Sequence, residues 1–194
     1  MLKFNLYYDY ENKNLEEFAF DALVKEKESK NIGYYHLPEN SVKLIEELNK
    51  IDIEFEKIAV IGIGGSSLGT KAIYRLLKSN YKNIKEIVFL ENTDPIELKN
   101  QFSKIDKNNT LFLVISKSGT TIETISIFKA VIEYFELDFT KDKIMVITDP
   151  HSPLEKFANK YRIQTFNIPE NVGSRFSVFS VVGIVPLYLA GFDV

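Results

Sequence analysis

The chain has 194 residues, of which 45% are hydrophobic and 26% charged, and a formal net charge of −3. This composition is ordinary for a globular domain with a sizeable core, and the charge gives no reason to expect a nucleic-acid partner or a membrane surface. The absence of cysteine excludes disulfides and thiolate metal sites, and we expect a cytoplasmic protein. The sequence has no apolar run long enough to span a bilayer.

Residues 1–52 predict a helical segment that packs on the rest of the chain. The stretch 14–31 carries apolar side chains at the spacing of one helix face: Leu15, Phe18 and Ala22. The stretch 38–50 predicts a second helix, with Asn40 or Ser41 as its N-cap.

From Lys57 onwards, short apolar runs alternate with helical patterns. The apolar runs, rich in β-branched and aromatic residues, predict five strands: 57–63, 86–90, 110–115, 143–148 and 163–168. Helical patterns follow them in turn: 67–79, 94–102, 121–135, 152–160 and 176–192. This alternation is typical of a parallel sheet with helices on both faces. We therefore expect a doubly wound α/β domain with a five-stranded parallel sheet over residues 53–194.

Ligands of such folds bind beyond the carboxyl ends of the strands, near the point where the strand order reverses. The first loop of interest there is GIGGSSLG, residues 62–69, which holds four of the nine glycines and leads into a helix N-terminus that favours anions. It begins like a dinucleotide-binding fingerprint, but Ser67 stands where the third glycine belongs. Because Glu91 could imitate the ribose-binding acid, an NAD-dependent dehydrogenase is an alternative, as is a purely structural turn.

The second loop is SKSGTTIET, residues 116–124. It concentrates hydroxyl side chains in one turn: Ser116, Ser118, Thr120 and Thr121. Gly119 permits the sharp turn, the following helix supplies backbone donors, and a phosphate dianion can bind several such donors at once. Lys117 adds a positive charge or points to solvent. The alternative is a helix-capping turn, but capping needs one such residue rather than four, so the sequence predicts an anion site.

The third loop is PENVGSRFS, residues 169–177. It places a single arginine, Arg175, just before an apolar helix. We expect this cation to face the same cleft as the other two loops, and a structural ion pair is the alternative.

Taken together, these loops resemble the glucose-6-phosphate isomerase family. GIGGSSLG is similar to the family's first glycine-rich loop, SKSGTTIET to its phosphate loop, and NVGSRFSVFSVVGIVPLYLAG to its arginine signature. IGYYHLPEN also resembles the segment ahead of the first sheet in bacterial members. The resemblance covers about residues 30–194 and implies a sugar-isomerase (SIS) domain.

The resemblance also implies roles for individual residues. Gly65 and Ser66 would contact the sugar, Arg175 would stabilise the charge of a cis-enediolate, and Glu123 would orient a ring-opening histidine. The phosphate site would be lined by one run of residues: Ser116, Lys117, Ser118, Gly119, Thr120 and Thr121. The implied reaction interconverts glucose 6-phosphate and fructose 6-phosphate, in glycolysis and gluconeogenesis, without a metal or a redox cofactor.

The sequence departs from the family pattern in two ways. Ser174 follows Gly173 where a second glycine is usual, and its side chain could crowd the sugar. The family also has a second SIS domain, with a glutamate that shuttles the proton, a histidine and a lysine, and this half is absent here. We therefore expect the N-terminal part of a homodimeric enzyme, inactive by itself, in which we can nominate no catalytic base. The alternatives are a non-catalytic sugar-phosphate sensor, another aldose–ketose isomerase, or a structural half that pairs with a second polypeptide.

Overall fold

The computed structural model describes residues 12–194, which fall into two compact units divided between Ile32 and Gly33. The described part of the first unit is mainly one helix, α1 (Lys13–Glu28), which confirms the helix predicted for 14–31. None of its side chains is buried, and several large apolar ones are exposed: Leu15, Phe18, Phe20, Leu23 and Val24. Residues 1–11 of the predicted segment 1–52 lie outside the described residues, and the packing of α1 stays a prediction.

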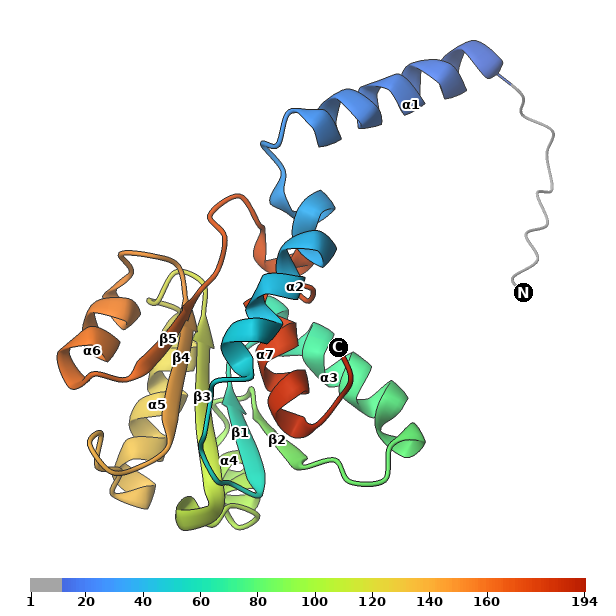
Figure 1. The fold of residues 1–194 in the computed structure, drawn as a ribbon. Coiled ribbons are helices and arrows are strands. Elements are labelled where there is room, and N and C mark those ends of the chain that lie inside the picture. The colour runs from blue at the N-terminus through green and yellow to red at the C-terminus, as the bar shows by residue number, and fades with distance from the viewer. Residues whose placement is uncertain (1–11) are drawn as a thin grey trace. The chain divides into compact units, whose positions relative to one another are not determined.

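The second unit, Gly33–Val194, is built on a five-stranded sheet with the order β2-β1-β3-β4-β5 (Figure 1). Its strands are β1 (Lys57–Ile61), β2 (Glu86–Leu90), β3 (Thr110–Ser116), β4 (Ile144–Thr148) and β5 (Gln164–Asn167). All neighbouring strands run parallel. The predicted strands and the parallel sheet are therefore confirmed.

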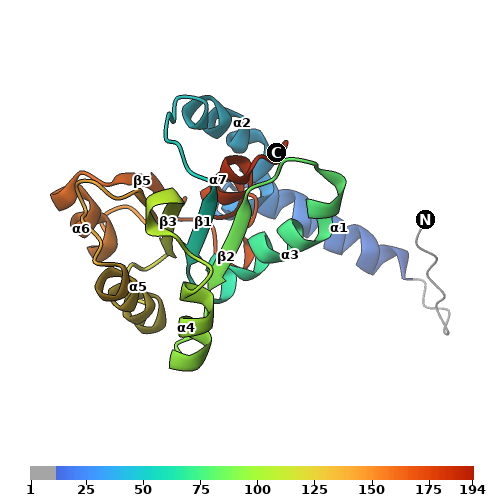
Figure 2. The same cartoon turned by 90° about the horizontal axis from the view of Figure 1, so that it is seen from below.

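Helices cover both faces of the sheet. They are α2 (Leu37–Leu48), α3 (Leu68–Leu77), α4 (Pro95–Phe102), α5 (Ile122–Phe135), α6 (Pro153–Tyr161) and α7 (Val181–Ala190). Figure 2 shows α2, α3 and α7 on one face of the sheet and α4, α5 and α6 on the other. This is the doubly wound α/β arrangement that the alternating sequence predicts.

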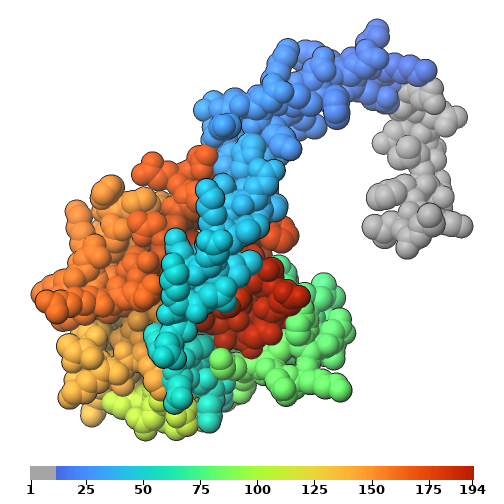
Figure 3. Space-filling model, viewed as in Figure 1, coloured from blue at the N-terminus to red at the C-terminus, as the bar shows by residue number. Residues whose placement is uncertain are grey.

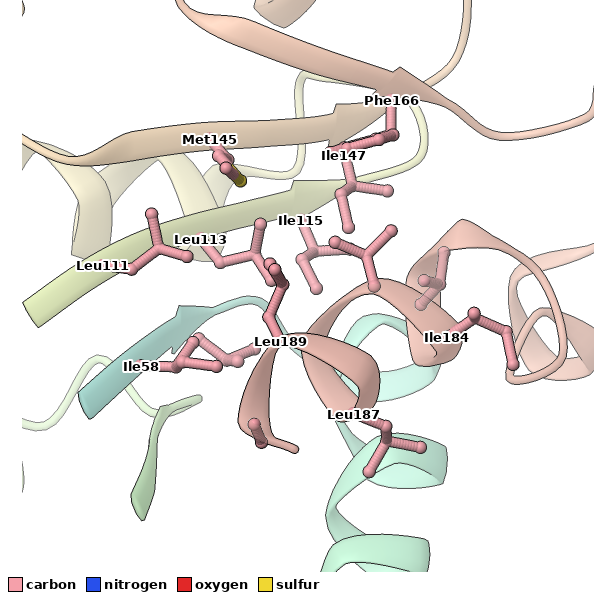
Figure 4. Packing of buried hydrophobic residues seen from close by; sticks show 14 of the residues in the cluster. Ile58, Leu111, Leu113, Ile115, Met145, Ile147, Phe166, Ile184, Leu187 and Leu189 are labelled. Carbon is pink, nitrogen blue, oxygen red and sulfur yellow. The ribbon is translucent and has the colours of Figure 1, made fainter. Parts of the chain in front are cut away.

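Every residue of β3 is buried, because both faces of this central strand are covered. Along the strand, side chains alternate between two apolar clusters. Leu113 and its neighbours on the same face join a cluster that includes Leu189 of α7, whereas Phe112 joins a cluster with residues of α4, α5 and α6. Figure 4 shows Ile58, Leu113 and Leu189 gathered between the strands and α7. The packed core therefore fixes the carboxyl ends of the strands, from which the loops of the candidate site extend.

The predicted start of α2, with Asn40 or Ser41 as its N-cap, is wrong. The helix begins at Leu37, with Pro38 in its first turn, where the fixed φ of proline suits a helix. Ser41 is inside the helix, and its hydroxyl donates to the carbonyls of Leu37 (2.7 Å) and Phe179 (2.6 Å) instead of capping. In the space-filling view of Figure 3, α2 lies against α7, with which it shares contacts.

The apolar helix predicted for 176–192 is shorter than expected, because α7 begins only at Val181. Ser180 caps it, its Oγ accepting a hydrogen bond from the Val182 N–H (3.3 Å). A 3-10 turn, Ser174–Phe176, precedes it and carries the predicted arginine loop. Within residues 12–194, every helix is too short or too polar to cross a membrane.

Asp94 caps α4, with its Oδ1 accepting from the N–H groups of Ile96 (2.9 Å) and Glu97 (2.8 Å). We expect Asp94→Ala to lower the free energy of unfolding by about 1 kcal/mol, since alanine offers no acceptor to these donors. Urea denaturation measures this. Asp94→Ser can retain a cap and should lose less, and an equal loss in both variants would contradict the capping role.

Candidate functional site

The first two predicted loops leave the sheet at its switch point. From β1 the chain passes to β2 on one side, and from there to β3 on the other side of β1. A reversal of this kind opens a crevice at the carboxyl ends of the strands, where α/β proteins bind ligands. The glycine loop follows Ile61 at the end of β1, and the hydroxyl-rich loop follows β3, which ends at Ser116.

The glycine loop is in direct contact with the arginine loop. The 3-10 turns Gly64–Ser66 and Ser174–Phe176 pack on each other. A Cβ added to Gly65 would lie 2.2 Å from the carbonyl oxygen of Ser174. Glycine is required at position 65 because only a residue without a side chain allows the two backbones to approach so closely.

In the hydroxyl-rich loop, the side chains hydrogen bond to one another. The Ser116 hydroxyl donates to Thr121 Oγ1 (3.3 Å), and Ser118 Oγ accepts from the N–H (3.2 Å) and hydroxyl (3.0 Å) of Thr120. Gly119 has a φ of 66°, in the left-handed region that favours glycine. The turn thus brings its hydroxyls together at the end of β3.

These hydroxyls do not cap the following helix. Thr121 is the N-cap residue of α5 but makes no capping hydrogen bond through its side chain. The first backbone bond of the helix runs from the Ile125 N–H to the Thr121 carbonyl (3.0 Å), which leaves the preceding N–H groups without an intrahelical acceptor. The capping interpretation of this loop therefore has no support, and its donors suit an anion.

Lys117 does not point freely to solvent. Its Nζ lies 2.9 Å from each carboxylate oxygen of Asp149. The two residues meet because Ser116 and Thr148 are paired in the sheet, so that the next residue of each strand also lies opposite the other. Sequence reasoning missed Asp149, since no local pattern connects two residues that are 32 positions apart.

One pocket, of about 280 Å³, joins all three loops. Its lining is mostly polar: Ile63, Ser66, Lys117, Ser118, Thr121, Asp149 and Ser174. The structure therefore brings together four of the predicted site residues: Ser66, Lys117, Ser118 and Thr121. Hydroxyl groups in a pocket of this size are suited to bind a phosphate group, and the lysine in the lining is paired with the Asp149 carboxylate.

The other predicted site residues do not line this pocket. Ser116 and Gly119 are buried beneath the turn, and Gly65 packs on Ser174. Thr120 lines a different, largely apolar groove of about 670 Å³ between α5 and α6. The remaining two, Glu123 and Arg175, are exposed.

Arg175 follows Ser174, which does line the pocket. None of the ion pairs formed by residues 12–194 involves Arg175, so the alternative of a structural ion pair finds no support in the part of the chain that is described. Glu123 lies in the first turn of α5, where a carboxylate also stabilises the helix dipole. The functional roles of Arg175 and Glu123 stay predictions.

The loop between β4 and α6 packs against the hydroxyl-rich loop. A Cβ added to Gly119 would lie 2.9 Å from Ser152 Oγ, which caps α6 by accepting from the Glu155 N–H (3.0 Å). Hydrogen bonds from the Asn167 side chain and from the His151 N–H hold the pKa of the Glu155 carboxyl below its usual value. Glu155 is therefore an ionised acceptor at neutral pH and ties the start of α6 to the last residue of β5, Asn167.

The dinucleotide alternative loses its ribose-binding acid. Glu91 forms an ion pair with Lys71 of α3, and both side chains are mostly buried. The other carboxylate oxygen of Glu91, Oε2, is buried without a hydrogen-bond partner among the described residues, so burial, rather than the ion pair alone, keeps this acid from a ribose.

Residues 49–194 match the family model described as phosphoglucose isomerase. The chain belongs to the phosphoglucose isomerase family. It is 43% identical over 173 residues to the glucose-6-phosphate isomerase of Campylobacter jejuni, a match that covers 87% of this chain and 43% of that protein. The resemblance seen in the sequence is thus confirmed.

Solved structures agree with this membership. A hypothetical protein from Thermus thermophilus superimposes with a TM-score of 0.81 at 28% identity, over 93% of this chain and 46% of that one. A glucose-6-phosphate isomerase from Chlamydia trachomatis gives a TM-score of 0.67 at 33% identity, over 79% and 30%. The predicted SIS-type α/β fold is confirmed, and the chain spans less than half the length of each of these three proteins.

Ser174, the residue that departs from the phosphoglucose isomerase pattern, contributes to the pocket wall. Its carbonyl oxygen faces Gly65 and accepts a hydrogen bond from the Ser177 hydroxyl (2.7 Å). The backbone of Ser174 is thereby fixed on both sides, so that a side chain at this position has a defined direction at the edge of the pocket.

Proposed function

We propose that this chain is the sugar-phosphate-binding part of a glucose-6-phosphate isomerase, which interconverts glucose 6-phosphate and fructose 6-phosphate through a cis-enediolate. The observation that carries the proposal is the convergence of three loops on one pocket. Ser66 comes from the glycine loop, Ser118 and Thr121 from the phosphate loop, and Ser174 from the arginine loop. Family membership of residues 49–194 supports the same assignment.

In this proposal the phosphate binds to the hydroxyls of Ser118 and Thr121 and to the N–H groups that begin α5. Ser116 and Gly119 shape the turn, and Thr120 holds Ser118 through two hydrogen bonds. Binding energy gained at the phosphate is available to position the reacting carbons at the other end of the sugar. Gly65 and Ser66 would contact the sugar itself.

The chemical step moves a proton between C2 and C1 of the open-chain sugar. Arg175, next to Ser174 at the pocket edge, would stabilise the negative charge that develops on the enediolate oxygens. A general base must reach the C2 proton, and among the described residues the carboxylate that lines the pocket, Asp149, is paired with Lys117. We nominate no base in this chain and expect it to show no turnover alone.

The wider assignments follow from the same proposal. They are a cytoplasmic location, a place in glycolysis and gluconeogenesis, and a homodimeric state for the whole enzyme. The proposed partner of the pocket is a hexose phosphate, and the proposed chemistry is redox-neutral, so it requires no nicotinamide.

An NMR titration of isotope-labelled chain with fructose 6-phosphate tests the proposal. We expect amide shifts in residues 64–67 and 116–121, larger with the sugar phosphate than with inorganic phosphate, because only the sugar reaches Ser66. Shifts confined to residues 62–69 and produced by NAD would favour the dehydrogenase alternative. The absence of shifts with fructose 6-phosphate would contradict sugar-phosphate binding by this chain.

A further inference from the structure

The ion pair between Lys117 and Asp149 lies inside the pocket that we assign to the substrate phosphate. Both residues line the pocket, and their side chains are only 24% and 26% exposed. The Lys117 Nζ is 2.9 Å from both carboxylate oxygens. The Asp149 carboxylate therefore lies in the same pocket that a phosphate dianion would have to enter.

Asp149 neutralises the charge that would attract phosphate. Among the described residues that line this pocket, Lys117 is the one cation. With its ammonium group bonded to Asp149, an incoming phosphate meets neutral hydroxyl and N–H donors, and it must compete with the carboxylate for Lys117. The two anions also repel each other, and this repulsion is stronger in a partly buried pocket than in open water.

Backbone hydrogen bonds, and not only the two flexible side chains, hold Lys117 and Asp149 next to each other. The Asp149 N–H donates to the Lys117 carbonyl (2.9 Å), and the Thr148 hydroxyl also reaches that carbonyl (3.3 Å). These bonds do not depend on the Asp149 carboxylate. A variant that changes only this side chain therefore keeps the strand ends together.

We infer that Asp149 is a counter-ion that competes with phosphate for Lys117 and so limits the affinity of the pocket for any phosphate group. The inference rests on the proposed function of the pocket. Its consequence is that the phosphate loop alone does not hold an anion tightly. A ligand must add contacts on the Ser66 side, as a sugar phosphate can, and a bound sugar phosphate can leave again.

The test removes the charge and keeps the shape. In Asp149→Asn, we expect the affinities for inorganic phosphate and for fructose 6-phosphate to rise by about five- to tenfold, because Lys117 loses its competing partner. Calorimetric or NMR titration at one fixed ionic strength measures both. In a Lys117→Met background the same change should still raise both affinities, because Asp149 then repels the phosphate without a compensating cation, and the extra gain seen with Lys117 present measures the competition for its ammonium group.

Glu86→Gln is the matched control. Glu86 pairs with Lys57 at 2.9 Å, where β1 and β2 begin, at the opposite end of the strands from the pocket. The substitution changes the net charge of the chain as Asp149→Asn does, and it should leave both affinities unchanged. An equal gain in the control would show a general charge effect and overturn the inference.

The remaining outcomes of the titration are equally decisive. Weaker phosphate binding in Asp149→Asn would show that Asp149 positions Lys117 for the ligand, and unchanged binding would show that it has no influence; either overturns the inference. Asp149→Ser removes the same charge with a shorter side chain and should give the same gain if Asn perturbs the fold. If the wild type and both variants bind neither phosphate nor fructose 6-phosphate, the proposed function fails as well.

Discussion

Replacing Gly65 with alanine is expected to weaken the binding of fructose 6-phosphate by about 10²-fold, while the chain stays folded. The new Cβ would lie 2.2 Å from the Ser174 carbonyl oxygen, and this is a backbone atom that cannot rotate away. The glycine loop and the arginine loop must then separate, which misplaces Ser66 relative to the phosphate loop. Overpacking of this kind costs about 1–3 kcal/mol of stability. Calorimetric titration and urea denaturation measure the two effects.

Gly173→Ala is the matched control for this experiment. A Cβ at position 173 meets only Phe176 Cδ2, at the ordinary distance of 3.8 Å, and its φ of −69° suits any residue. We expect this variant to bind fructose 6-phosphate as the wild type does. Unchanged binding by Gly65→Ala would contradict a site that is built by the contact between the two loops, and a large loss in Gly173→Ala would show that any added bulk in the arginine loop is harmful.

The fold could be predicted because its strands carry a strong signal. A strand such as β3, covered on both faces, is apolar at nearly every position, and a short run of this kind between two helical patterns is typical of a buried parallel strand. Once the alternation is recognised, the carboxyl ends of the strands must lie at one edge, together with the loops that follow them. The clustering of Ser66 and Ser118 around one pocket follows from this topology.

Features that depend on contacts between distant segments could not be predicted. Asp149 is an ordinary acidic residue in the sequence, and it becomes a partner of Lys117 only through the register of β3 and β4. Ser41 looks like a helix cap because its hydroxyl is suited to that role, yet tertiary packing gives it the Phe179 carbonyl as an acceptor. The start of α7 at Val181 could not be predicted, because the residues before it are also apolar and hydrophobicity alone does not distinguish a buried turn from a buried helix.

Removal of two hydroxyls from the phosphate loop, Ser118→Ala with Thr121→Val, is expected to lower the affinity for fructose 6-phosphate by about 10²-fold. Both side chains line the pocket, and each would lose a charge-assisted hydrogen bond to the phosphate. Stability should fall by about 1–3 kcal/mol, because Thr121→Val removes the acceptor of the buried Ser116 hydroxyl, whereas Ser118 is exposed and its loss should cost little. Titration of each single variant and of the pair measures the loss.

The control for this pair is Ser126→Ala, which removes an exposed hydroxyl from the second turn of α5 and should leave the affinity unchanged. The ratio of affinities for the sugar phosphate and the unphosphorylated sugar adds a sharper criterion. If the two hydroxyls bind the phosphate, the double variant loses its preference for the phosphorylated sugar as well as its affinity. If the double variant binds more weakly but keeps the full preference, the phosphate must bind somewhere other than at these hydroxyls. The start of α5, which lacks a side-chain cap, would then have only a structural role.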